Sequence, residues 1–172
     1  MKPEEILASL KKDVKGIKDA RIDEKTYNLK KKYAVKSIWL TVGAKDLRTA
    51  VAALIKAHPD PHFSVCSGYD LGKTVEMLYH FTVNYGQRAA ETAVTMKVPL
   101  DKKALTIDTI TDMVPAAIIS EREMQEMLGV KIRNIPDGRR LFLDETFPKG
   151  VYPWRKDEKG PHKLIRNVHG GR

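Results

Sequence analysis

The runs FSVCSGYDL (residues 63–71), TVEMLYHFTVNY (74–85) and ETAVTMKVPL (91–100) decide the fold. β-Branched and aromatic residues are frequent in all three, and the breaks between them contain Gly72 and Gly86. Short glycine-containing connections usually join neighbouring antiparallel strands. These runs are therefore predicted to form an antiparallel meander.

Upstream of the meander, the sequence predicts alternating helices and strands. Apolar residues recur at helical spacing over residues 2–15, whereas the chain alternates weakly over 20–29 and strongly over 36–42. A second helix is predicted over 44–58, because Pro59 ends the pattern. The expected fold class is α/β (α+β), with a mixed, largely antiparallel sheet and packed helices.

The character of the chain changes towards its carboxyl end. A further helical region is predicted from about Thr109, and beyond Gly129 the sequence is rich in proline and arginine and has little periodicity. A loop of this length is rarely structureless in a compact domain unless it is functional or lies on a partner. We predict an α/β sandwich domain over residues 1–130 and an extended partner-binding arm over 131–172.

The composition is that of a soluble globular protein of 172 residues, 42% hydrophobic and 31% charged. Its single cysteine, Cys66, suggests a reducing compartment, and no apolar run approaches the roughly 20 residues of a membrane helix. We therefore expect a cytoplasmic protein. The net charge of +9 suggests an acidic partner, nucleic acid or an anionic membrane, and is equally compatible with the charged surface of a heat-adapted protein.

No residue pattern predicts catalysis or metal binding. The prolines between His58 and His62 prevent a helix that would align them as ligands, so a solvated loop is the favoured interpretation. Cys66 and His80 lie in predicted strands, where a buried thiol and a strand histidine are favoured over a nucleophilic pair. A hydrolase built on Ser67 and His80 is a poor alternative. It would be excluded if the Ser67 hydroxyl lay beyond hydrogen-bonding distance of every histidine.

The sharpest local pattern is SEREMQEMLGV (residues 120–130). Ser120 followed by Glu123 matches a capping box, in which each side chain accepts a hydrogen bond from a backbone N–H at the start of a helix. The sequence therefore predicts a structural cap at these two residues. The predicted cap does not use Glu121 and Arg122, which are therefore available for other contacts.

The predicted arm interleaves basic and aromatic residues. This mixture is typical of protein interfaces and is also compatible with RNA binding. The prolines favour an extended path across a protein surface, and the motifs of common RNA-binding modules are absent. The residues concerned are Arg133, Arg139, Arg140, Lys149, Arg155, Lys156, Lys159, Lys163 and Arg166, with Phe142, Phe147, Tyr152 and Trp154.

Three motifs in order resemble the family of the 30-kDa subunit of respiratory complex I. They are TITDMVPAAIISEREMQEMLGV (109–130), PDGRR (136–140) and YPWRKD (152–157), and the resemblance extends over roughly residues 36–157. Glu126 stands where the family has Asp, and Ile135 where it has His. The short chain and its tail resemble the branch found in membrane-bound nickel–iron hydrogenases and related ferredoxin-dependent complexes.

The resemblance implies a subunit without a cofactor of its own or catalytic residues. Its arm would wrap the large catalytic subunit beside the Fe-S small subunit, which would carry the Fe-S clusters and possibly a nickel–iron centre. The complex would lie on the cytoplasmic side of the cell membrane, contacting the membrane arm only indirectly, and would evolve hydrogen or reduce sulfur. No nucleic acid is then expected, although an RNA-binding module remains the alternative, recognisable by steep salt dependence.

The interface residues expected from the motifs are Glu121, Arg122, Arg139, Arg140, Tyr152, Trp154, Arg155, Lys156 and Asp157. Their cations are expected to pair with carboxylates of the large subunit while the aromatic rings bury against it. Replacement of Arg140 or Arg155 by alanine should then weaken assembly without changing the isolated fold.

Overall fold

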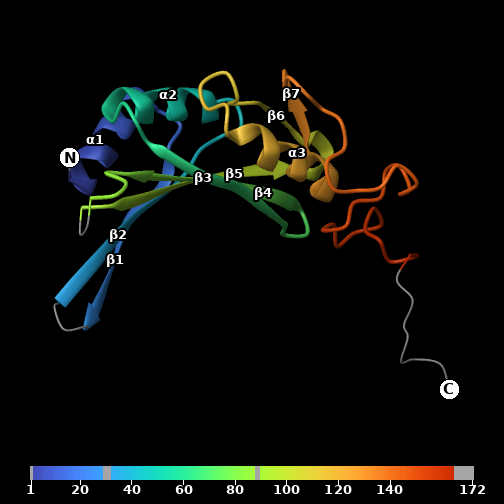
Figure 1. The fold of residues 1–172 in the computed structure, drawn as a ribbon, viewed down its shortest axis with the longest axis horizontal. Helices are drawn as coiled ribbons and strands as arrows, with labels where there is room; N and C mark the ends of the chain where they lie inside the picture. The colour runs from blue at the N-terminus through green and yellow to red at the C-terminus, as the bar shows by residue number, and fades with distance from the viewer. Residues whose placement is uncertain (1, 29–31, 88–89, 165–172) are drawn as a thin grey trace.

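The computed structural model describes residues 2–28, 32–87 and 90–164 (Figure 1). The elements follow one another as α1 (Pro3–Asp13), β1 (Lys18–Asn28), β2 (Lys32–Thr41), α2 (Leu47–Ala57), β3 (His62–Asp70), β4 (Thr74–Val83), β5 (Thr92–Asp101), a 3-10 turn η1 (Lys102–Ala104), β6 (Thr106–Asp108), α3 (Ala117–Leu128) and β7 (Lys131–Arg133). Over the part that is described, no helix is long and apolar enough to cross a membrane.

Five strands form the main sheet in the order β1-β2-β5-β4-β3. The β2–β5 pair is parallel and the other pairs are antiparallel. The predicted α/β class with a largely antiparallel mixed sheet is therefore confirmed, as is the meander β3-β4-β5. β1 and β2 continue beyond the body of the domain as a two-stranded ribbon (Figure 1).

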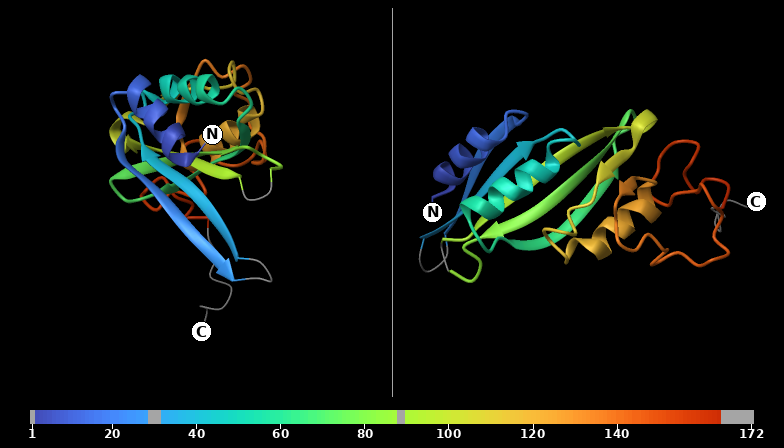
Figure 2. Two further views of the ribbon diagram at one scale, coloured as in Figure 1. Left: turned by 90° about the vertical axis from the view of Figure 1, so that its left-hand side faces the viewer. Right: turned by 90° about the horizontal axis from the view of Figure 1, so that it is seen from above.

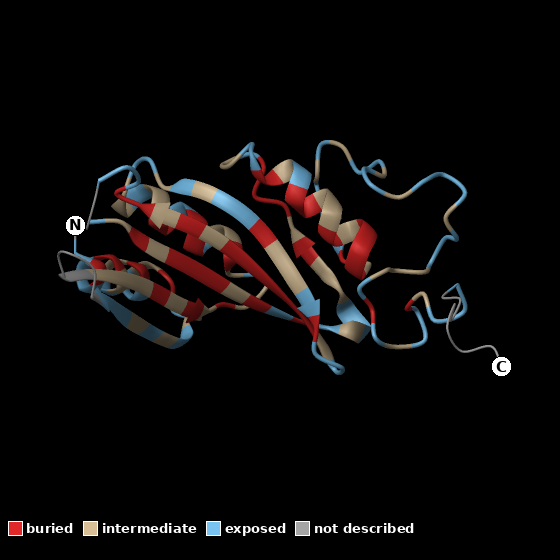
Figure 3. Ribbon diagram, turned by 60° about the horizontal axis from the view of Figure 1, so that its bottom comes forward, coloured by how far each residue is buried: buried red, intermediate tan, exposed pale blue. Residues whose placement is uncertain are grey.

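The helices cover one face of this sheet (Figure 2). β4 is largely buried (Figure 3), and its alternate residues Val75, Met77, Tyr79 and Phe81 are at most 1% exposed, because a strand presents every second side chain to the same face. α3 approaches β3 closely at Gly68, where a Cβ atom would lie 2.8 Å from Leu128 Cδ1 and 2.9 Å from Met124 Sδ. Glycine at this position lets α3 rest directly on the edge strand.

Residues 106–133 differ from the prediction. The helix expected from about Thr109 begins only at Ala117, after β6 and a turn that contains Pro115. β6 pairs in parallel with β7, which lies inside the predicted arm and places Ile132 in the core. Strands of three residues carry too little periodicity to be predicted, and they form here because the two segments meet in space.

Candidate functional site

Glu121 is buried where α3 meets β4 and the turn after β6. Its side chain is 0% exposed, and one carboxylate oxygen accepts hydrogen bonds from the Ile110 N–H (3.1 Å) and the Tyr79 hydroxyl (3.2 Å), while the other accepts one from the Thr109 hydroxyl. Burial raises the pKa of Glu121, although these hydrogen bonds oppose the shift. The Glu121 carboxylate holds the chain's own turn, which argues against the expected contact of this residue with a partner.

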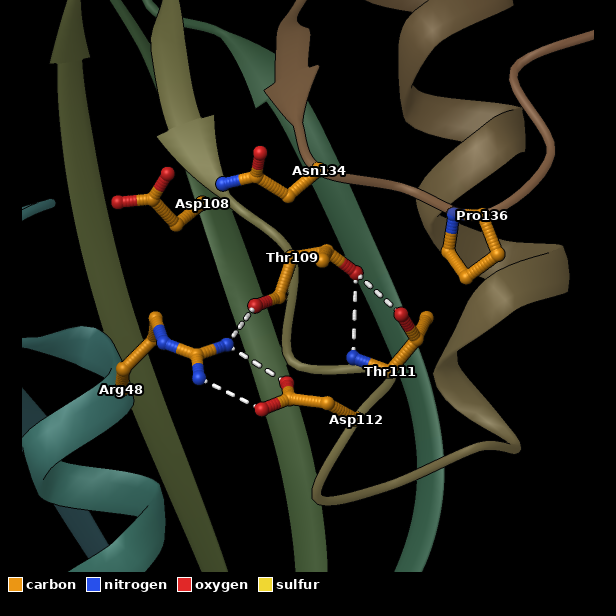
Figure 4. Close-up of a pocket in the computed structure, with 7 residues that line it drawn as sticks. All are labelled: Arg48, Asp108, Thr109, Thr111, Asp112, Asn134 and Pro136. Carbon is orange, nitrogen blue, oxygen red and sulfur yellow. Dashed lines mark hydrogen bonds and ion pairs between the residues drawn. The ribbon is translucent and has the colours of Figure 1, made fainter.

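The same turn borders a pocket of about 440 Å³ (Figure 4). Arg48 of α2 donates to both carboxylate oxygens of Asp112 (2.6 Å each) and to the Thr109 carbonyl. Asp108, also on the wall, is paired with Arg133 (2.8 and 2.7 Å). The opposite charges at the pocket are thus already matched; one pair holds α2 against the turn and the other holds β7 against β6.

The predicted capping box is wrong. α3 begins three residues earlier, so Ser120 lies inside the helix, where its hydroxyl donates to the Ala117 carbonyl (3.3 Å) and accepts from the Cys66 N–H of β3 (3.1 Å). No side-chain hydrogen bond caps the helix start, and Glu123 has no role there. Ser120 instead fastens the helix to the edge strand, a role that the Ser-x-x-Glu pattern cannot distinguish from a cap.

A buried ion cluster fastens the end of the arm to the domain. Lys102 Nζ lies 2.7 Å from Oδ2 of both Asp70 and Asp157. Arg155 is ion-paired with Asp157, lies 3.6 Å from Asp70, and donates to the Leu128 carbonyl (3.2 Å). The four charges balance within the chain, so they hold the arm without a partner.

The carboxylates and the lysine of this cluster stay charged because neighbouring groups stabilise their ionised forms. Burial alone would raise the pKa of both Asp70 and Asp157. Hydrogen bonds outweigh burial and lower both pKa values: those to Asp70 come from Lys102 and backbone N–H groups, and those to Asp157 come from Arg155, Lys102 and a backbone N–H. For Lys102, burial acts to lower the pKa, and the two carboxylates raise it. All three groups therefore remain ionised at neutral pH.

This cluster bears on the expected role of Arg155. Its side chain is 3% exposed and its charge is paired with the chain's own carboxylates, which argues against direct pairing with a partner. Asp157 is partly exposed, with its Oδ2 oxygen shared by Arg155 and Lys102. Lys156 projects an exposed side chain while its N–H donates to Asp70 (2.9 Å), so its partner contact stays a prediction.

A second fastening joins α3 to residues 137–142. Arg122 donates to the carbonyls of Arg139 (2.9 Å) and Arg140 (3.0 Å) and lies 3.3 Å from Asp137. One helical turn later, Glu126 accepts hydrogen bonds from two successive N–H groups, those of Leu141 and Phe142. Sequence reasoning gave Glu126 no function, and the only available signal was its position four residues after Arg122 on the same helix face.

The carboxyl end of α3 is closed by Tyr152. Gly129 follows the helix with φ +74°, and a Cβ atom there would lie 2.6 Å from the Tyr152 ring. The next turn of the arm is fixed by the Trp154 N–H, which donates to the Met127 carbonyl (2.9 Å). Partner contacts of Tyr152 and Trp154 stay predictions.

The arm exposes large apolar side chains although its backbone is held by the contacts above. Phe142 is 57% exposed and Trp154 43% exposed, and Leu141 and Leu164 are exposed as well. Arg139 is also exposed and, among the described residues, is ion-paired with Asp137. We call the exposed side chains of Leu141, Phe142 and Trp154 together the outer surface of the arm.

Ser67 and His80 do lie within hydrogen-bonding distance, 2.9 Å between Ser67 Oγ and His80 Nε2. This distance therefore does not exclude a hydrolase built on Ser67 and His80. On the next strand, His80 Nδ1 meets the Thr95 hydroxyl (3.1 Å), which cannot stabilise an imidazolium as a carboxylate does, and burial lowers the pKa of His80. Ser67 lies in a regular ladder opposite Leu78, so the arrangement is best interpreted as a cross-strand hydrogen-bond chain.

His58 and His62 contact different side chains. His58 Nε2 lies 3.1 Å from the Asn84 amide oxygen, and the His62 ring stacks on Tyr85 at 4.1 Å between centroids. Within residues 2–28, 32–87 and 90–164, no group of three or more His, Cys, Asp or Glu side chains could hold a metal ion.

Comparison with known proteins gives consistent similarities. The family model described as "Respiratory-chain NADH dehydrogenase, 30 Kd subunit" matches residues 40–163. The chain is 30% identical over 139 residues to the membrane-bound hydrogenase subunit beta of Pyrococcus furiosus, covering 80% of this chain and 79% of that one. It is 35% identical over 81 residues to formate hydrogenlyase subunit 5 of Escherichia coli, covering 45% of this chain but only 14% of that one.

A solved structure shares the fold. It is the membrane-bound sulfane sulfur reductase, an archaeal respiratory membrane complex, in which one chain superposes with a TM-score of 0.61 and 19% identity, covering 89% of this chain and 83% of that one.

Proposed function

Because the chain belongs to the family of the respiratory-chain NADH dehydrogenase 30-kDa subunit, we propose that it is a structural subunit of a membrane-bound, ferredoxin-dependent electron-transfer complex. It holds the large catalytic subunit beside the Fe-S small subunit, in a complex of the hydrogenase type that evolves hydrogen or reduces sulfur. The Fe-S clusters, and a nickel–iron centre where one is present, belong to those partners. The chain lies peripherally on the cytoplasmic side of the membrane.

One observation carries this proposal. The outer surface of the arm exposes Phe142 and Trp154, while ion pairs and hydrogen bonds on the inner side hold the backbone in place. Aromatic side chains exposed on a fixed scaffold are typical of binding sites, because they bury a large area on association and little order has to be gained.

The length of the relatives supports a large polypeptide as the partner. In the Escherichia coli protein the matching segment makes up 14% of the chain, so the rest of that chain is covalently attached to it. Covalent linkage raises the effective concentration of two modules that function together. Where the two modules are separate chains, they would meet by non-covalent binding.

The arginines favour a protein partner over RNA. Arg133, Arg139 and Arg155 are each paired with an aspartate of the chain itself. Binding to phosphates would require these pairs to be broken, which makes a nucleic-acid surface the weaker interpretation of the basic arm.

Co-purification tests the proposal. The tagged chain, isolated from membranes of its source, should bring down a large subunit and an Fe-S small subunit that mass spectrometry identifies. The double variant Phe142→Ser, Trp154→Ser should retain the fold and lose binding by roughly 30-fold or more, since each ring is expected to act as a hot spot. Tyr85→Ser, which changes a side chain 63% exposed elsewhere on the domain, serves as the matched control.

Two results would contradict the proposal. Either the wild-type chain is recovered without such subunits, or the double variant recovers them as well as the Tyr85→Ser control does.

A further inference from the structure

Arg140 differs from every other arginine in the described part of the chain. Each of the others forms an ion pair with an aspartate: Arg21 with Asp23, Arg48 with Asp112, Arg122 and Arg139 with Asp137, Arg133 with Asp108, and Arg155 with Asp70 and Asp157. Arg140 has no carboxylate within ion-pair distance among the described residues, although hydrogen bonds from Thr146 and the charge of Arg140 together lower the pKa of the nearby Asp144. In the described part of the arm, Arg140 is thus the arginine that no direct ion pair holds.

The loop after Arg140 fixes the orientation of this guanidinium. Its Nη1 donates to the carbonyls of Asp144 (2.8 Å) and Phe147 (2.9 Å), which closes the loop around the side chain. Within the described part, no hydrogen bond occupies Nε or Nη2. A guanidinium presents its donors in a rigid planar fork, so one edge is anchored and the other remains available to a carboxylate.

A cavity of about 580 Å³ lies at this position. Its lining contains three arginines and one acid: Arg122, Arg139, Arg140, Glu145, together with Leu143. Arg122 and Arg139 both pair with Asp137, so Arg140 is the lining arginine without a direct ion pair. Leu141 and Phe142, which follow Arg140 in the sequence, have exposed apolar side chains.

We propose that this cavity is the socket for an aspartate or glutamate side chain of the partner polypeptide, which pairs with the free edge of Arg140. The inference rests on the proposed function and names the chemistry by which the partner is recognised. An acidic side chain flanked by apolar residues fits the site better than a small free anion, because the exposed side chain of Phe142, two residues after Arg140, offers apolar area that only a polypeptide can bury. Charge pairing of this kind fixes the register of an interface.

Chemical cross-linking of the assembled complex tests the socket. In Arg140→Lys, a carbodiimide that couples lysine directly to a carboxylate should join position 140 to an acidic residue of the partner. Lys102 is the internal positive control, because its Nζ lies 2.7 Å from Asp157 Oδ2 and should couple within the chain. The inference is overturned if the Lys102 cross-link forms and position 140 couples to nothing, or only to Asp144 or Glu145.

Modification of the unmutated chain provides an independent measurement. Phenylglyoxal should label Arg140 in the free chain and leave it largely unlabelled in the complex, with Arg21 on the hairpin labelled equally in both. Equal labelling of Arg140 in both states would overturn the inference even if Arg140→Lys failed to assemble.

A binding measurement completes the test. Arg140→Gln should weaken association by about 30-fold, equivalent to about 2 kcal/mol. Unchanged affinity overturns the socket while leaving the proposed function intact, whereas a wild-type chain that recovers no partner overturns the proposed function itself.

Discussion

Arg155→Ala should release the end of the arm from the isolated chain. The substitution leaves Asp70, whose carboxylate is completely buried, and Asp157 with Lys102 as their remaining cation. Removing one member of a buried ion pair costs about 3–5 kcal/mol when the surviving charge is left unpaired, and Lys102 lowers that cost here by keeping both carboxylates partly paired. Hydrogen–deuterium exchange should therefore accelerate over residues 151–164, including the Trp154 N–H, while β4 and β5 stay protected.

Arg21→Ala is the control for this prediction. It removes a guanidinium that is more than half exposed and pairs with Asp23 on the hairpin, so the arm should be unaffected. If Arg155→Ala leaves exchange in the arm unchanged and impairs only assembly, Arg155 acts at the interface after all. That was the role the motifs suggested, and the buried position of the side chain argues against it.

Glu121→Ala should destabilise the whole domain. It removes the acceptor for the Ile110 N–H and for the hydroxyls of Tyr79 and Thr109, and it leaves a cavity beneath α3. Each buried donor left without a partner costs about 1–3 kcal/mol, so a loss of about 3–5 kcal/mol in the free energy of unfolding is expected. Urea unfolding of the isolated chain measures it.

Glu121→Gln separates the shape of this side chain from its charge. Because burial raises the pKa of Glu121 in the folded chain, its contribution to stability is full below a pH of about 4 and declines as the pH rises through the folded-state pKa. The glutamine variant lacks this decline, so its stability relative to wild type should improve with rising pH. A stability difference that does not vary with pH, or a mild effect of Glu121→Ala, would contradict the account of Glu121.

The sequence is sufficient to predict the strands of the main sheet but not the separate two-stranded sheet of β6 and β7. The meander followed from alternation interrupted by glycine breaks, and α2 ends at Ala57, just before the proline that predicted its end. β6 and β7 have three residues each, too few for a period to be visible. Their pairing depends on tertiary contact, which no local pattern contains.

The motifs select residues of α3 and the arm, whose contact with a partner stays a prediction. The motifs identified the residues of α3 and the arm, but they could not show that Glu121 and Arg155 point inward. Asp70, which accepts the Lys156 N–H, lies 86 positions earlier in the chain, and such a pairing becomes visible only when the chain is folded. Ser120 was misassigned because a hydroxyl that bonds inside a helix and one that caps it share the same sequence pattern.

The most direct test of the central claim, that the outer surface of the arm binds the partner, is hydroxyl-radical oxidation of the free chain and of the assembled complex. Phe142 and Trp154 should be oxidised in the free chain and protected in the complex, with Tyr85 oxidised equally in both. Contradiction would come from Phe142 and Trp154 remaining equally reactive while protection appears instead at Val65 and Tyr69 on β3.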